Sequence, residues 1–268
     1  MAEGKGRVLV IAGSDSGGGA GIQGDIKTIT ALQGYAATAI TALTAQNTLG
    51  VQGIFDIPAA FIRQQILSVL DDIGADAIKT GMLHNAEIIA AVADTITPYR
   101  HIPLVLDPVM LAKGGAALLQ PDAIAVLKEG LIPLAALVTP NLPEAERLSG
   151  MSIRTIDDME KAAQAILALG CQAVLIKGGH GEGNEVHDLL LTRDYREIFT
   201  QPRLYTRHTH GTGCALASAI ATGLAQGMTL SAAVARARRY VRKAMETAPG
   251  FGQGNGPLGH GHTVAGFV

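Results

Sequence analysis

The sequence predicts an α/β protein, with a mostly parallel central sheet and helices on both faces in a single domain. Three observations predict this fold. Short apolar runs alternate with amphipathic helical stretches along the whole chain, an order typical of strands joined by crossover helices. The 268 residues, 48% of them hydrophobic, can bury one large core without disulfides. No low-complexity linker and no internal repeat divides the chain.

The first half of the chain predicts strands and helices in alternation. Apart from Lys79, each expected strand is a short continuous run of Ala, Val, Ile, Leu or Thr, as in strands buried on both faces. Each expected helix has apolar residues repeating every three to four positions. In order, we expect a strand at 8–12, a glycine loop, a helix at about 20–32, a strand at 36–43, a helix at 61–73, a strand at 77–80, a helix at 86–93 and a strand at 104–106.

The second half continues this alternation and adds a more exposed strand pair. Pro143 suits the start of a helix, because the N–H that proline lacks would have no partner there. Gly170 suits the end of one. In order, we expect a strand at 137–139, a helix beginning near Pro143, a helix at 156–169, a strand at 173–176, an antiparallel strand pair at 186–192 and 197–206, and two closing helices at 213–225 and 230–247.

The charge balance argues against a nucleic-acid-binding protein. Lys and Arg number 21 against 23 Asp and Glu, which gives a net charge of -2 and no basic footprint. Arginines do gather at Arg236, Arg238, Arg239 and Arg242, but they lie on a helical pattern. We expect them to form a solvated helix face.

The chain predicts a reduced, soluble, cytoplasmic protein with no membrane segment. Residues Met1 to Gly6 lack the apolar region of a signal peptide, and no apolar stretch reaches the length of a membrane span. Cys171 and Cys214 form neither a CxxC pair nor a disulfide framework.

Polar residues follow nearly every expected parallel strand. Because the carboxyl ends of parallel strands meet at one edge of the sheet, and ligands bind there, we expect these residues to form an active site. They are Gly13 to Asp15, Gln46 and Asn47, Gly81 and Met82, Asp107, Asn141 and Glu144, and Lys177 to Gly179.

The segment His208 to Cys214 is a glycine-rich turn that opens an alanine-rich helix. Such a turn presents free backbone N–H groups at the positive end of the helix dipole, where a phosphoryl group in transfer could be held. The same field would favour the thiolate of Cys214, which could then accept a proton from an attacking hydroxyl. A packing turn with a small buried cysteine explains the local pattern equally well.

Gly19, Gly21 and Gly24 formally match the GxGxxG dinucleotide motif, but their context does not. The motif begins well past the end of the expected first strand, and residues 41–48 offer no acidic side chain for a ribose. A loop that lets the backbone and Asp25 approach a small ligand fits better.

Asp107, Asn141 and Glu144 supply the oxygen ligands that magnesium prefers, usually together with waters and phosphate oxygens. Each could instead be an ordinary turn or cap residue. Lys177, which precedes two glycines, suits a phosphate contact, although a structural lysine is the alternative. The sequence contains no Walker A motif and no HExxH zinc motif.

Motifs spread over nearly the whole chain resemble those of the hydroxymethylpyrimidine/phosphomethylpyrimidine kinases of thiamine biosynthesis. They occur in that family's order, which makes the set far more specific than any one member. They are Val8–Asp15, Gly17–Gln23, Thr41–Thr48, Lys79–Leu83, Val105–Met110, Thr139–Ala145, Lys177–His180 and Thr209–Cys214.

The resemblance implies a ribokinase-like fold, ATP and Mg²⁺ as cofactors, and a homodimer. It also implies two phosphorylations, first of 4-amino-5-hydroxymethyl-2-methylpyrimidine and then of its monophosphate to the diphosphate. Cys214 itself favours the pyrimidine-kinase branch, because much of the wider ribokinase-like superfamily, which the sequence resembles, has Asp at this position. The alternatives are a pyridoxal or pyridoxine kinase, a non-catalytic ligand-binding protein on the same scaffold and, more distantly, a dehydrogenase.

The resemblance also implies roles for individual residues. Gln46 is expected to bind the aminopyrimidine edge, because a side-chain amide offers a donor beside an acceptor. Lys113, Gly114 and Gly115 resemble a mobile loop that covers the substrate. The other implied roles are pocket residues Gly13, Asp25, Met82 and His210; an anion hole at Gly211, Thr212 and Gly213; Cys214 as base; ATP contacts at Lys177, Gly178, Gly179 and Asn141; and magnesium contacts at Asp107, Asn141 and Glu144.

The glycine-rich tail from Gly250 is the main departure from the resembled family. We expect residues 1–268 to form one domain, with residues 1–6 and about 250–268 flexible or peripheral. The sequence assigns no role to this tail.

Overall fold

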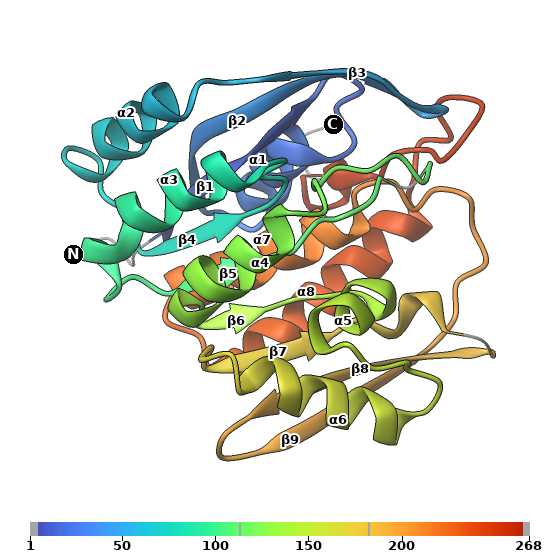
Figure 1. Ribbon diagram of the computed structural model, residues 1–268. Coiled ribbons are helices and arrows are strands. Elements are labelled where there is room, and N and C mark those ends of the chain that lie inside the picture. The colour runs from blue at the N-terminus through green and yellow to red at the C-terminus, as the bar shows by residue number, and fades with distance from the viewer. Residues whose placement is uncertain (1–4, 113, 182, 265–268) are drawn as a thin grey trace.

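A nine-stranded sheet runs through the computed structural model, which describes residues 5–112, 114–181 and 183–264 (Figure 1). The strand order is β3-β2-β1-β4-β5-β6-β7-β8-β9. The six inner strands from β2 to β7 are parallel, while β3, β8 and β9 run antiparallel to their neighbours. The strands are β1 (Arg7–Asp15), β2 (Tyr35–Asn47), β3 (Gly50–Asp56), β4 (Ala77–Thr80), β5 (Leu104–Leu106), β6 (Leu137–Val138), β7 (Ala173–Ile176), β8 (Glu185–Thr192) and β9 (Arg196–Pro202).

Helices cover both faces of the sheet, and the alternation of strand side chains divides the core in two. Leu9 and Ile11 of β1 pack toward the layer of α2 to α6, whereas Val8 and Val10 pack toward α1, α7 and α8. The helices are α1 (Gly21–Ala31), α2 (Ala59–Leu70), α3 (Ala86–Ile96), α4 (Ala123–Val126), α5 (Leu142–Ser149), α6 (Ile156–Leu167), α7 (Thr212–Ala225) and α8 (Leu230–Glu246). The predicted mostly parallel α/β fold is confirmed.

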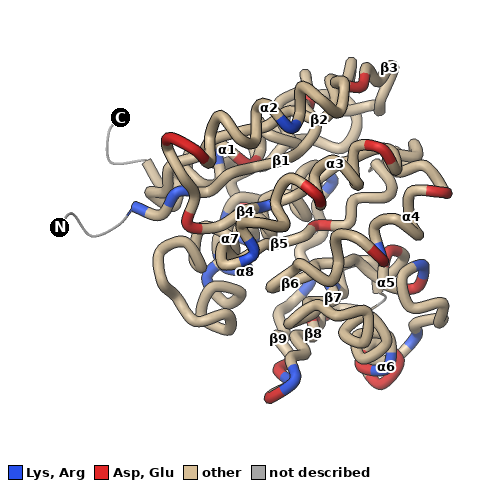
Figure 2. The backbone as a smooth tube through the Cα atoms, turned by 60° about the vertical axis from the view of Figure 1, so that its left-hand side comes forward, with Lys and Arg blue, Asp and Glu red and all other residues tan. Residues whose placement is uncertain are grey.

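Charged residues are spread over many elements, and one arginine does not lie where the sequence predicts. Figure 2 shows acidic and basic residues interspersed over many elements, and α6 carries both. The predicted solvated arginine face, however, is wrong for Arg238. Its side chain is buried and pairs with Asp188 of β8 at 2.7 Å, with its guanidinium over the ring of Phe199. Arg238 lies on the same face of α8 as the buried Val234 and Val241, four residues before it and three after it.

The C-terminal segment from Gly250 to Val264 packs against the body of the protein. Leu258 is buried in the α7–α8 core, and Pro257 forms a β-bridge with His210. In the described ranges, no helix combines the length and the apolar character that crossing a membrane requires.

Candidate active site

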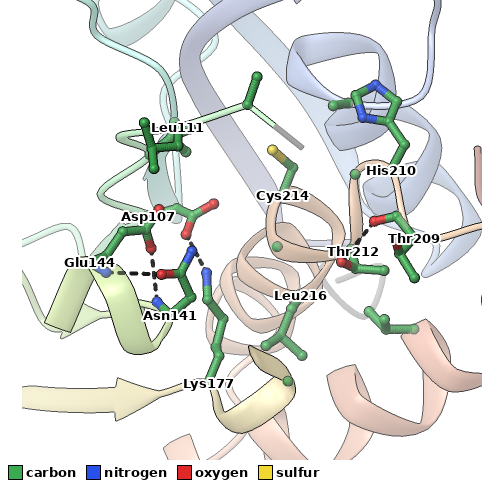
Figure 3. A pocket seen from close by; sticks show the side chains of 18 of the residues that line it. Asp107, Leu111, Asn141, Glu144, Lys177, Thr209, His210, Thr212, Cys214 and Leu216 are labelled. Carbon is green, nitrogen blue, oxygen red and sulfur yellow. Dashed lines mark hydrogen bonds and ion pairs between the residues drawn. The ribbon is translucent and has the colours of Figure 1, made fainter. Parts of the chain in front are cut away.

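A cavity of about 500 Å³ opens at the carboxyl ends of the parallel strands, where the sequence predicts the site. It brings together nearly all of the predicted site residues. Those that line it are Gly13, Gln46, Met82, Asp107, Asn141, Glu144, Lys177, Gly179, His210, Gly211, Thr212, Gly213 and Cys214. Figure 3 shows Cys214 at the start of α7, between the group around Asp107 and the side chain of His210.

The turn before α7 depends on a close backbone approach at Gly211. This residue has φ +85°, and a Cβ there would collide with the carbonyl oxygen of Gly19. The Thr212 hydroxyl donates to the Thr209 carbonyl at 3.0 Å and closes the turn. The amides of Gly213 and Cys214 then lie in the first helical turn, where backbone N–H groups have no partner within the helix. The turn can therefore accept an anion.

The expected thiolate of Cys214 is not the resting form. Burial raises the pKa of the thiol to about 11, and the carboxylates of Asp25 and Asp107 act in the same direction. The Lys79 ammonium and the Gly21 backbone N–H oppose this rise without cancelling it. The loss of hydration around the sulfur thus outweighs the field of the helix start.

Asp25 does not line the cavity as expected. Its carboxylate is completely buried behind the wall, where it accepts from Lys79 Nζ at 2.8 Å and from the Ser218 hydroxyl at 2.7 Å. Ser218 lies one helical turn after Cys214. Sequence reasoning missed this buried triad, although a lysine inside the short apolar run Ala77–Thr80 was a usable signal.

Asp107 and Glu144 form an acidic edge beside Lys177. Lys177 Nζ lies 2.8 Å from Asp107 Oδ1, which also accepts from the Thr139 hydroxyl. Asn141 and Glu144 form a reciprocal capping box at the start of α5, so the alternative interpretation of Asn141 as a helix cap is confirmed. Burial and the nearby Asp107 raise the pKa of Glu144 to about 7, against the attraction of Lys177.

These donors fit a magnesium ion that is bound mainly through phosphate and water. No group of three His, Cys, Asp or Glu side chains with the spacing of a metal site occurs within the described ranges. Two carboxylates and one amide beside a lysine match the small number of protein ligands that Mg²⁺ takes when a phosphate supplies the others.

Gln46 and His210 meet on the opposite side of the cavity. Their Nε2 atoms lie 3.4 Å apart, and the Thr44 hydroxyl donates to Gln46 Oε1 at 3.1 Å. His210 Nε2 is also 2.8 Å from Asp15 Oδ2. Together these contacts place one side-chain amide and one imidazole where a flat polar ring could bind.

Asp15 explains the glycine loop that matched GxGxxG. Its carboxylate accepts from the backbone N–H groups of Gly17, Gly19 and Ala20. Burial raises the pKa of Asp15, but the His210 contact and these amides outweigh it and hold the pKa below its usual value. The loop therefore uses its amides internally, which agrees with the rejection of a dinucleotide motif.

Gly178 also differs from expectation, because its amide is already bonded and it does not line the cavity. It donates to Asp188 Oδ1 at 2.8 Å, and Asp188 Oδ2 accepts from Arg238 Nε. Asp188 and Arg238 line the cavity although the sequence did not predict either. Of the predicted covering loop, Lys113 lies outside the described residues, while Gly115 lines the cavity.

Comparisons with known protein sequences agree on one family. A family model described as phosphomethylpyrimidine kinase matches residues 15–259. The chain is 52% identical to the thiamine biosynthesis bifunctional protein ThiED of Geobacter sulfurreducens over 96% of its own length, but it spans only 52% of that relative. It is 49% identical to the hydroxymethylpyrimidine/phosphomethylpyrimidine kinase of Bacillus subtilis, covering 95% of this chain and 94% of that one.

A solved structure with a similar fold is an ADP complex of Bacillus subtilis pyridoxal kinase. Its TM-score is 0.88 at 39% sequence identity, with 96% of this chain and 97% of that chain covered.

Proposed function

The chain belongs to the phosphomethylpyrimidine kinase family, and on that premise we propose that it phosphorylates 4-amino-5-hydroxymethyl-2-methylpyrimidine with ATP and then its monophosphate to the diphosphate. The observation that carries the proposal is the position of Cys214. It stands at a helix start in one cavity with Lys177 on one side and with Gln46 and His210 on the other.

In the proposed reaction, the hydroxymethyl oxygen attacks the γ-phosphorus of ATP in line, and the bond to the leaving ADP oxygen breaks. The proton of the alcohol passes to the sulfur of Cys214 in the fraction of the enzyme that carries this residue as the thiolate. Amides of the first turn of α7, together with Lys177, stabilise the charge on the transferring group. Gln46 and His210 hold the ring so that its hydroxymethyl group faces Cys214.

We place the phosphates of ATP at Lys177 and Gly179, and Mg²⁺ at Asp107, Glu144 and Asn141. The donor set supports this, since carboxylate and amide oxygens lie next to a partly buried lysine at the cavity edge. Bound magnesium would neutralise phosphate charge during transfer.

The test is substrate-dependent conversion of ATP to ADP, with the products identified by phosphorus NMR. Hydroxymethylpyrimidine, its monophosphate and pyridoxal are assayed separately. We expect turnover with the first two compounds. Turnover with pyridoxal alone, or ATP consumption that depends on none of the three, would contradict the proposal.

A pyridoxal kinase is the second candidate, because of the likeness to the Bacillus subtilis pyridoxal kinase. Such an enzyme phosphorylates an alcohol once. Only the proposed enzyme accepts a substrate that already carries a phosphate, so the monophosphate arm of the assay separates the two.

We also propose that the chain forms a homodimer. Large apolar side chains are exposed on the β2–β3 hairpin and at the start of α2, namely Leu43, Leu49, Phe55 and Phe61, and Leu43 lies directly opposite Phe55 in the strand pair. Such a surface is typical of a protein contact. Light scattering on the purified protein measures the mass directly, and a monomeric mass would contradict the proposal.

A further inference from the structure

The glycine-rich C-terminal tail touches the hairpin that carries Gln46. The Asn255 amide donates to the Thr48 carbonyl at 2.9 Å, and the Gly254 amide lies 3.3 Å from the Thr48 hydroxyl. Thr48 is in the turn between β2 and β3, two residues after Gln46. Residues 254 and 255 therefore hold one side of the cavity from outside.

The next two tail residues contact His210, whose side chain meets that of Gln46. The His210 amide donates to the Gly256 carbonyl at 3.2 Å, and His210 forms a β-bridge with Pro257. Beyond them, Leu258 is buried and the Gly259 amide donates to the Ala244 carbonyl of α8 at 2.8 Å. The segment is thus anchored to the helix layer and contacts the backbone near both ring-binding side chains.

Glycine is required at two positions of this segment by space alone. A Cβ at Gly254 would collide with the Thr48 carbonyl oxygen, and a Cβ at Gly256 would collide with the ring of His208. In contrast, a Cβ at Gly261 of the same tail would meet no atom within 4 Å, and its φ is not positive. The tail also approaches Thr48 closely at Gly252 and the end of α8 closely at Gly259, whereas Gly261 has room for a side chain.

We propose that residues 254–257 are a positioning strap that sets the separation of Gln46 and His210 and thereby the affinity for the pyrimidine ring. This inference rests on the proposed function. The 3.4 Å contact between the two side chains is short enough that a shift of the Thr48 turn would change the geometry of both donors toward a bound ring. The strap makes no contact with Lys177 or Asp107 among the bonds of the described residues, so ATP binding should not depend on it.

The test compares Gly254→Ala with Gly261→Ala in steady-state kinetics. We expect Gly254→Ala to raise the KM for hydroxymethylpyrimidine by about tenfold or more. The KM for ATP should stay within about twofold of wild type. Gly261→Ala should match wild type in both. An unchanged pyrimidine KM in a folded Gly254→Ala enzyme, or parallel rises in both KM values, would overturn the strap.

A second pair of variants guards against loss of folding. Gly256→Ala should weaken pyrimidine binding, and adding His208→Ala should restore part of it, because the side chain that collides is then removed. No recovery in the double variant, with both variants folded by circular dichroism, would also contradict the strap. If the wild-type protein phosphorylates pyridoxal and no pyrimidine, the proposed function fails, and the same variants then test the strap through the KM for pyridoxal.

Discussion

At the scale of single residues, two physical effects act in opposite directions on the pKa of Cys214, the proposed base. The helix start attracts negative charge, but burial and two nearby carboxylates disfavour it, and the pKa rises to about 11. The proposed base is therefore mostly protonated near neutral pH. A proton acceptor of this kind works only through the small fraction that is ionised.

This predicts a rate that climbs with pH. Above about pH 8, kcat should increase by up to about tenfold per pH unit until the thiol ionises. Cys214→Asp should move this rise to lower pH, because a carboxyl group ionises well below a thiol in the same place. The pH dependence of kcat for both enzymes checks this, with Cys214→Ala as the control that lacks a base. A wild-type profile that is flat above pH 8 would remove Cys214 from its role.

The buried Lys79–Asp25 pair gives a second prediction, this time for stability. Lys79→Met leaves the Asp25 carboxylate buried without its partner, and should lower the free energy of unfolding by about 3–5 kcal/mol. Lys79→Met combined with Asp25→Asn removes both charges and should recover most of this loss. Urea denaturation of the single and double variants measures the difference. An equal loss of stability in the single and the double variant would show that the unpaired Asp25 charge does not cause it.

Much of the candidate site could be predicted from sequence because its residues follow strands. Parallel topology alone brings Gln46, Asp107 and Lys177 to one edge. The positions of Asp25 and Gly178 could not be predicted, since each depends on a specific partner in another element. Asp25 pairs with a lysine 54 residues away, and the Gly178 amide with an aspartate on the next strand.

At the scale of elements, α8 is coupled to the proposed phosphate loop through one buried ion pair. Arg238 of α8 bonds Asp188 of β8, and Asp188 in turn accepts from the Gly178 amide. Asp188 therefore holds the turn after Lys177 in place through the Gly178 amide.

We predict that Asp188→Ala raises the KM for ATP while leaving the KM for the pyrimidine near wild type. It should also lower the free energy of unfolding by about 3 kcal/mol, because Arg238 stays buried without its partner. Arg239→Ala, a change at the exposed neighbour, should cost less than about 0.5 kcal/mol. Steady-state kinetics and thermal melts separate the two effects. A larger change in the pyrimidine KM than in the ATP KM would contradict this coupling.

The elements that the sequence predicted best are those buried on both faces. Ala77–Thr80, Leu104–Leu106 and Ala173–Ile176 lie at their predicted bounds, because a continuous apolar run has no other stable place. The edge strand β3 was missed, since none of its residues is buried and its sequence has no apolar run. The short helical turns from Ala123 to Leu134 were missed as well, because they join α, π and 3₁₀ geometry and have no single period.

At the scale of the whole molecule, the cavity is lined by residues in or just after all six parallel strands, so a ligand that fills it should stabilise the entire fold. Mg²⁺ with ATP at about 100 times its Kd should add about 2.7 kcal/mol to the free energy of unfolding. Excess EDTA should remove most of this gain if the metal is held together with the phosphates. Differential scanning fluorimetry with ATP, with and without the chelator, checks this. An identical melting temperature under both conditions would contradict the magnesium site.

The anchoring of the tail has a consequence for the order in which a newly made enzyme becomes competent. The bond between Gly254 and Thr48 joins residues 206 positions apart. A chain emerging from the ribosome can pair all six parallel strands once β7 is complete, since the last of these strands ends at Ile176. At that stage the β2–β3 turn beside Gln46 would still lack its contacts with residues 254 and 255. The proposed ring pocket therefore gains its backbone support only after the parallel strands have been synthesised.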